Sequence, residues 1–282
     1  MKKILLLLGL MLLASPVSLA NCEYSCVAPY NMNSKFRSFM SSVSGINFAT
    51  EKAAEAAIKK AITKKAENEN LRVKIDSFSS KDLKNGIFKS MSVEGENLHL
   101  NDIYLSSLKL NTLCDFNYVQ EVGKDIVFKE ELPMSFEMEF SPSDINKTMK
   151  SEKYQRIIKD LNKLGSSYAG GVKIGSTKVE IKSGKFQYII GISIPFIKSE
   201  QKIILSSDLM VKKGKIDFKN THIVSKAFHL DLKKTDFILN YLNPLDFSVN
   251  ILENKDAKVS VNNVKIKNDR VVTDGVVVIP KD

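Results

Sequence analysis

Three cysteines have the clearest capacity for covalent chemistry in this chain: Cys22, Cys26 and Cys114. In an oxidising compartment Cys22 and Cys26 could close a small disulfide loop and leave Cys114 free. If Cys22 were instead the lipidated first residue of a lipoprotein, Cys26 could pair with Cys114. A metal site is the weaker interpretation, because no second pair of ligands completes a tetrahedral shell around Cys22 and Cys26.

Side chains suited to catalysis do not form a recognisable set. The histidines His99, His222 and His229 are isolated in the sequence, and none forms the H-x-x-x-H pair of a zinc site. There is no G-x-S-x-G nucleophile motif and no phosphate-binding glycine loop. Glu137 and Glu139 share one face of a strand, but two acids alone do not define an acid–base pair. The sequence therefore predicts a protein that is not an enzyme and uses no metal or cofactor.

Two stretches have apolar residues at three- and four-residue steps, which predicts two amphipathic helices. The first follows Thr50, a plausible N-cap. Its stripe of mostly small apolar residues is Ala54, Ala57, Ile58, Ala61 and Ile62. The second is a long helix in the middle of the chain that starts at Ser141 or Ser143, with Pro142 in its first turn. We expect the stripe of the first helix to pack on a sheet.

Most of the remaining chain alternates apolar and polar residues, which is the period of a half-buried strand. The first clear run is Leu132, Met134, Phe136, Met138 and Phe140. The second is Phe186, Tyr188, Ile190, Ile192, Ile194 and Phe196. Turns containing Gly184 and Gly214 separate such runs. Long meandering strands with few helices predict an α+β protein with an antiparallel sheet. The order of a helix followed by strands occurs twice, over 50–140 and 143–224.

The first twenty residues have the pattern of a secretory signal peptide: Lys2 and Lys3, an apolar run over 4–14, and small residues before a cut after Ala20. We expect cleavage there and a periplasmic location. A lipobox ending at Cys22 is the alternative, although Asn21 departs from its usual small residue, and it would give a membrane-anchored lipoprotein. The predicted organisation is therefore a leader (1–20), an N-terminal segment (21–49) and one domain (50–282).

The net charge of +10 comes mostly from lysines that are spread along the chain. Such a distribution is typical of a solvated surface, and it also favours weak attraction to anionic lipid headgroups. The sequence has no nucleic-acid-binding motif and no arginine-rich helix, so nucleic acid is not an expected partner.

The sequence also contains several short motifs, among them the stretch Gly86–Leu98, the run Ile103–Leu108, the helix opening Phe140–Asn146 and the segment Asn243–Leu245. These motifs resemble the LmeA-type phospholipid-binding family. This resemblance implies a fold similar to the tubular lipid-binding (TULIP) type, in which a highly curved antiparallel sheet wraps a long helix as a half-barrel. It also implies an apolar groove for phospholipid between helix and strands.

The alternating strands could line such a groove with flexible Met and large Phe side chains. The residues predicted to contact lipid are Ala57, Ile58, Ala61, Phe136, Met138, Phe140, Ile190, Ile192 and Ile194. The same side chains could instead fill an ordinary core, which is the commoner place for such residues. The expected function is thus a periplasmic lipid-binding protein that stores or transfers phospholipid. The alternative is an envelope assembly or structural factor that binds a protein partner.

Overall fold

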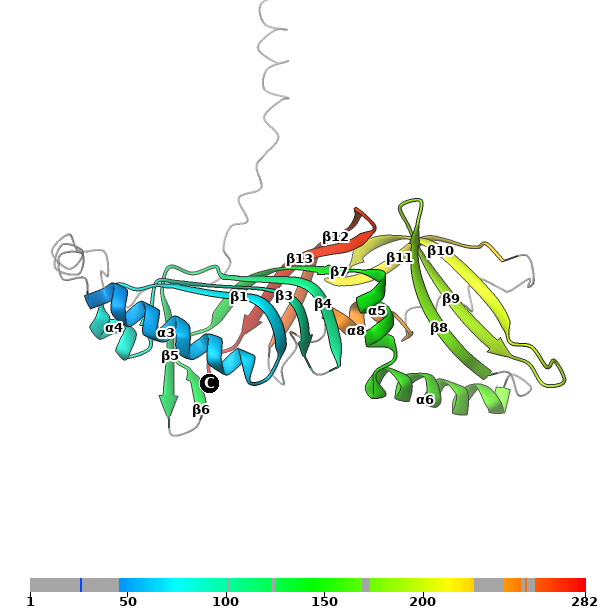
Figure 1. The fold of residues 1–282 in the computed structure, drawn as a ribbon, viewed down its shortest axis with the longest axis horizontal. Helices are drawn as coiled ribbons and strands as arrows, with labels where there is room; N and C mark the ends of the chain where they lie inside the picture. Colours follow the sequence, from blue (N-terminus) through cyan, green and yellow to red (C-terminus); the bar gives the residue numbers. More distant parts are fainter. Residues whose placement is uncertain are drawn as a thin grey trace, which may run out of the picture.

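The computed structural model describes residues 26, 46–100, 102–122, 125–168, 173–225, 241–249, 252 and 257–282. The protein is α+β, as predicted, and the strand pairs in the described ranges are antiparallel. Figure 1 shows an elongated molecule with two main sheets above and the helices α3 (Ile46–Thr63) and α6 (Glu152–Tyr168) below. The expected leader and Cys22 lie outside the described residues.

The larger sheet has six strands in the order β1-β3-β4-β7-β13-β12. Their bounds are β1 (Glu67–Asp76), β3 (Ser90–Leu100), β4 (Ile103–Thr112), β7 (Leu132–Phe140), β12 (Lys258–Lys267) and β13 (Arg270–Ile279). A smaller sheet beside it contains β2 (Ile87–Phe88), β5 (Asn117–Val122) and β6 (Asp125–Phe128), with α4 (Ser80–Lys84) preceding β2. The predicted strand over 132–140 is confirmed as β7, and its alternate residues Leu132 to Phe140 are all buried.

The second main sheet is a simple meander, in the order β11-β10-β9-β8. Its strands are β8 (Lys173–Lys182), β9 (Lys185–Ser193), β10 (Gln201–Lys212) and β11 (Lys215–Ile223). The second predicted alternation is present in β9, where Phe186, Tyr188 and Ile190 are buried, whereas Phe196 lies beyond the strand end and is exposed. No sheet is strongly curled, so the expected half-barrel is not confirmed.

The prediction of one long helix in the middle of the chain is wrong, because the structure has two helices there. The chain forms α5 (Pro142–Met149), turns at Lys150 and Ser151, and then forms α6 in a different direction (Figure 1). α5 starts at a capping box, in which Ser141 accepts from the Asp144 backbone N–H and the Asp144 carboxylate accepts from that of Ser141. The break follows from a second cap, because the Ser151 hydroxyl accepts from the Tyr154 backbone N–H at 3.3 Å.

The face that α3 turns toward the sheet also differs from the prediction. Ala57 and Ala61 are exposed, while Ile58 is half-buried and Glu55 is buried. The reason is that β1 is an edge strand, so the backbone N–H groups on its outer edge have no neighbouring strand to donate to. The Glu55 carboxylate accepts from the Ile75 N–H at 3.2 Å, and Glu51 accepts from that of Ser77 at 2.8 Å. Because Glu51 and Glu55 face the edge of β1, Ala57 and Ala61 lie on the outer side of α3.

The edge of the second sheet is capped in a related way, by asparagines. The Asn146 amide of α5 donates to the Val179 carbonyl at 2.8 Å and accepts from the Val179 N–H at 2.7 Å. Asn162 of α6 makes the same two bonds to Ile174. Each amide thus substitutes for a neighbouring strand along β8. In both halves of the chain, side chains of a preceding helix protect the first strand of the meander.

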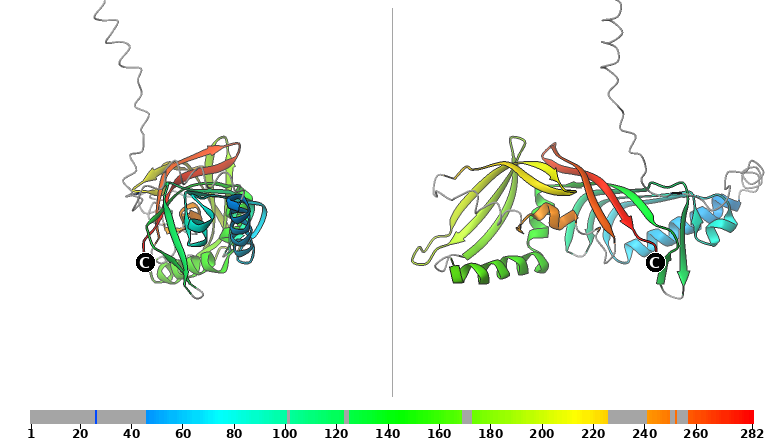
Figure 2. Two further views of the ribbon diagram at one scale, coloured as in Figure 1. Left: turned by 90° about the vertical axis from the view of Figure 1, so that its left-hand side faces the viewer. Right: turned by 180° about the vertical axis from the view of Figure 1, so that it is seen from behind.

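The two main sheets meet at α5, the β12–β13 hairpin and α8 (Pro244–Val249), as the rear view in Figure 2 shows. The Val261 N–H of β12 donates to the Gly214 carbonyl of the second sheet at 2.8 Å. Gly214 has φ +73°, and a Cβ atom there would lie 2.8 Å from the Ser260 hydroxyl. On the other side, the Ser106 hydroxyl of β4 donates to Asp144 of α5 at 2.5 Å.

One core cluster spans this junction and continues into both sheets. The largest fully buried side chains are Met138, Phe140, Ile145, Met149, Tyr154, Val179, Phe186, Tyr188, Leu205, Leu242, Leu245 and Val271. Tyr154 and Tyr188 place their hydroxyls 2.9 Å apart, and Tyr154 donates to the Leu242 carbonyl at 2.5 Å. This network connects α6, β9 and the residues that precede α8.

The disulfide that we predicted between Cys22 and Cys26 is wrong. Cys26 forms its disulfide with Cys114, 88 residues later in the chain. Cys114 is buried beside Asn117, whose side-chain amide donates to the Cys114 carbonyl at 2.9 Å. The observed pair is the one that we expected if Cys22 were lipidated. The short spacing of Cys22 and Cys26 in the sequence favours a local pair. The tertiary fold brings Cys114 next to Cys26, and sequence spacing does not show this.

Candidate functional site

Some apolar side chains that pack on the core, from both main sheets and from α3 and α6, are only half-buried, and we call them the inner apolar band. Its members pack against the buried core but keep accessible surface: Ile58, Val73, Met91, Leu110, Val259, Ile157, Leu161, Ile181, Ile192, Leu209 and Phe218. Leu110 and Val259 of the larger sheet pack against both core clusters, and one of these clusters extends from the larger sheet into the second sheet. An apolar ligand could cover this surface without requiring a polar partner.

The residues predicted to contact lipid divide into three groups. Phe136, Met138, Phe140 and Ile190 are 0–4 % exposed and form part of the packed core. Ile58, Ile192 and Ile194 are half-buried and therefore keep surface that a ligand could reach. Ala57 and Ala61 lie on the outer side of α3, as described above. Contact between any of these residues and lipid stays a prediction.

Sequence reasoning missed several members of the band. Leu209 of β10 and Phe218 of β11 continue alternating runs that begin at Ile203 and Ile216, so the period-two pattern could have found them. Leu110 was less visible because β4 alternates weakly, with Ser106 and Ser107 in its middle. Its place on the inner face follows from register, since it pairs with Phe136 of β7.

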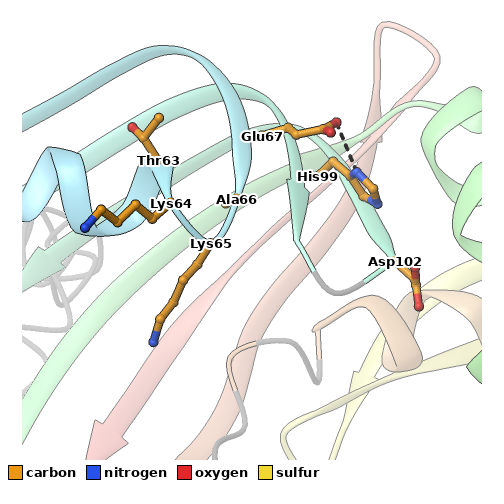
Figure 3. Close-up of a pocket in the computed structure, with 7 residues that line it drawn as sticks. All are labelled: Thr63, Lys64, Lys65, Ala66, Glu67, His99 and Asp102. Atoms are coloured by element: carbon orange, nitrogen blue, oxygen red, sulfur yellow. Dashed lines mark hydrogen bonds and ion pairs between the residues drawn. The ribbon is translucent and has the colours of Figure 1, made fainter. Parts of the chain in front are cut away.

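Two polar pockets lie near the junction of the two main sheets and share Asp102. The first, drawn in Figure 3, has a volume of about 290 Å³ and is lined by Thr63, Lys64, Lys65, Ala66, Glu67, His99 and Asp102. The second has about 350 Å³ and is lined by Asp102, Tyr104, Lys147, Lys150, Ser151 and Glu152. Neither pocket contains a residue from the predicted lipid-contacting set.

The rings of His99 and Tyr104 connect these pockets. They stack with centroids 4.2 Å apart, and the Lys147 ammonium lies 5.5 Å from the Tyr104 ring centroid. His99 Nδ1 is 3.2 Å from a Glu67 carboxylate oxygen, an interaction marked in Figure 3. A polar ligand in either pocket would meet both acidic and basic side chains. His99 and Lys147 already contact neighbouring side chains, Glu67 and Tyr104 respectively.

Over the described ranges, no group of three or more His, Cys, Asp or Glu side chains is placed to hold a metal ion. In the same part of the chain, no helix is both long enough and apolar enough to cross a bilayer. Comparisons with family models, curated proteins and solved structures give no match to this chain. The class of protein defined so far is an elongated α+β protein with two antiparallel sheets and an incompletely covered apolar band.

Proposed function

We propose that this protein binds an acyl-chain lipid, such as a phospholipid, along the inner apolar band. The observation that carries the proposal is that half-buried apolar side chains line the core along both main sheets, with Leu110 and Val259 packed against both core clusters. Each methylene that leaves water contributes about 0.8 kcal/mol, so an acyl chain covering part of the band is held without specific polar contacts. The resemblance to phospholipid-binding proteins of tubular fold agrees with this function.

A non-enzymatic role in the cell envelope, for lipid storage or transfer, belongs to the same proposal. The signal-peptide pattern of residues 1–20 supports export, and the Cys26–Cys114 disulfide supports an oxidising compartment such as the periplasm. The mature N-terminus is the point at which two forms of this proposal differ. One form is a free protein that begins at Asn21, and the other is tethered through an acylated Cys22.

Intact mass spectrometry of the protein exported by bacterial cells tests these forms directly. We expect a chain that begins at an unmodified Asn21, because Asn21 departs from the small residue that a lipobox has before its cysteine. A mass that includes acyl groups on Cys22 would show a lipoprotein instead. Retention of residues 1–20 in the exported fraction would contradict the signal-peptide assignment.

Organic extraction of the natively purified protein, followed by lipid mass spectrometry, tests lipid binding. We expect phospholipid in stoichiometric amount with the wild-type chain and about tenfold less with Leu110→Glu. The reason is that a carboxylate cannot be solvated beside acyl chains. Asn111→Glu is the matched control, because it places the same charge on the next residue of β4, which is exposed on the opposite face. We expect this control to retain its lipid.

A variant that fails to fold is distinguished by its far-ultraviolet circular dichroism and by loss of a cooperative unfolding transition in urea. Leu161→Glu provides a second position, on α6 beneath the other sheet, where the side chain is also half-buried. If folded wild-type protein contains no lipid and instead purifies with a stoichiometric protein partner, the assembly-factor alternative replaces this proposal.

A further inference from the structure

The connection between β9 and β10 presents large apolar side chains to solvent. Phe196 is fully exposed and Ile197 is 47 % exposed, just beyond the end of β9 at Ser193. Val224 is 48 % exposed. It lies at the same end of the sheet, since its N–H donates to the Ile204 carbonyl near the start of β10. Figure 1 shows this connection at the end of the molecule farthest from β1 and α3. We call Ile194–Lys198 the apolar tip.

The backbone of the apolar tip holds Phe196 outward. Phe196 has φ +71°, in the left-handed region that a bulky aromatic residue rarely adopts. The Ile197 N–H donates to the Ile194 carbonyl at 3.1 Å and closes the turn around it. Strained backbone that persists is over-determined by its surroundings and is concentrated at functional positions. The exposure of Phe196 is therefore built into the turn.

A carboxylate anchors the tip to the sheet behind it. Glu200 Oε1 accepts from the Ser176 N–H of β8 at 2.7 Å. Room for this carboxylate exists because two neighbouring residues are glycines: a Cβ atom on Gly191 would lie 1.9 Å from Glu200 Oε1, and one on Gly175 would lie 2.4 Å from it. The Gln201 amide further donates to the Ser199 carbonyl at 3.1 Å.

Exposed lysines surround the apolar tip. Lys198 follows Ile197 directly, and strand register places Lys202 opposite Gly191 and Lys173 opposite Ser193. The acidic residue of the connection, Glu200, is turned back onto the Ser176 backbone. An apolar point within a cationic rim is complementary to the surface of an anionic bilayer, where headgroups attract lysines and the interface accepts aromatic side chains.

We propose that the apolar tip inserts Phe196 and Ile197 into the interface of an anionic phospholipid bilayer, with Lys198, Lys202 and Lys173 at the headgroups. A single convex point with an isolated aromatic side chain suits a deformable lipid surface. This docking surface lies outside the inner apolar band and does not require that the band hold an acyl chain. Both could nevertheless serve one task, because the tip would place an end of the second sheet at a membrane.

The chain contains no tryptophan, so Phe196→Trp introduces a single fluorescent reporter at the tip. We use exported protein with Cys22→Ser, which removes any acyl anchor, and vesicles of phosphatidylglycerol and phosphatidylcholine. The emission should move to shorter wavelength on mixing, and brominated acyl chains should quench it. Tyr241→Trp, at another exposed aromatic position, is the control and should show neither change.

Vesicle cosedimentation measures the affinity. Phe196→Ser with Ile197→Ser should bind about tenfold or more weakly, as expected when two apolar side chains no longer leave water. Lys198→Gln with Lys202→Gln should weaken binding and reduce its salt dependence. Lys182→Gln with Lys213→Gln, at the hairpin turns at the opposite end of the sheet, should bind as wild type.

Unchanged vesicle affinity of the double serine variant would overturn the proposal, as would a Phe196→Trp reporter that brominated lipid does not quench. A tip that binds only a protein would give both of these results. Lipid extraction of the double serine variant separates the two proposals. Retained lipid with lost vesicle binding supports the tip alone as the docking surface, and vesicle binding by a wild-type chain without extracted lipid would refute only the lipid-holding function.

Discussion

Cys114→Ser is expected to lower the free energy of unfolding by about 4 kcal/mol, the largest effect anticipated for a single substitution here. The Cys26–Cys114 bond closes a loop with a sequence separation of 88 residues, and the entropy that such a cross-link removes from the unfolded chain grows with loop length. Urea denaturation of the exported protein, without reductant, measures the change.

The matched variants make this prediction specific. Cys26→Ser should destabilise by the same amount as Cys114→Ser, and the double variant should be no worse than either, because all three lose one bond. Cys22→Ser should leave the stability unchanged. The pattern expected for a Cys22–Cys26 pair is different: Cys22→Ser would then be destabilising and Cys114→Ser would have little effect through a cross-link.

Tyr154→Phe is expected to cost about 1–3 kcal/mol, because it leaves the buried Leu242 carbonyl without its donor. The Tyr188 hydroxyl also loses its contact with the Tyr154 hydroxyl but keeps a hydrogen bond with the Thr177 side chain. Tyr188→Phe should cost less, since the Tyr154 hydroxyl still donates to Leu242. Equal costs for the two variants in urea denaturation at neutral pH would contradict this assignment of donors.

The same tyrosines predict a loss of stability in alkali. Burial raises the pKa of Tyr154 well above its usual value of 10, and burial also raises the pKa of Tyr188. Above about pH 10 the unfolded chain releases these protons while the folded chain retains them, so the free energy of unfolding falls by about 1.4 kcal/mol per pH unit for each group. Below pH 10 neither group contributes to the slope. In the double Tyr→Phe variant, the slope above pH 10 should be shallower by these contributions.

Local periodicity determined much of the secondary structure from the sequence alone. The alternation over 132–140 specified β7 and its buried face, because a strand with one face in the core repeats every two residues. Turn residues specified the hairpins in the same way, since Gly184 and Gly214 both have the positive φ that their turns require. These features depend only on neighbours in the chain.

Only the tertiary structure determined which surfaces remain accessible and which distant residues meet. A helix period showed that α3 is amphipathic, but the N–H groups on the outer edge of β1 decided that Glu55 faces inward and Ala57 outward. Likewise, Cys114 meets Cys26. Phe136 is buried in the core, whereas Leu110, its partner on the neighbouring strand, keeps exposed surface. Such outcomes depend on sheet edges and on packing between segments far apart in the sequence, which no local pattern encodes.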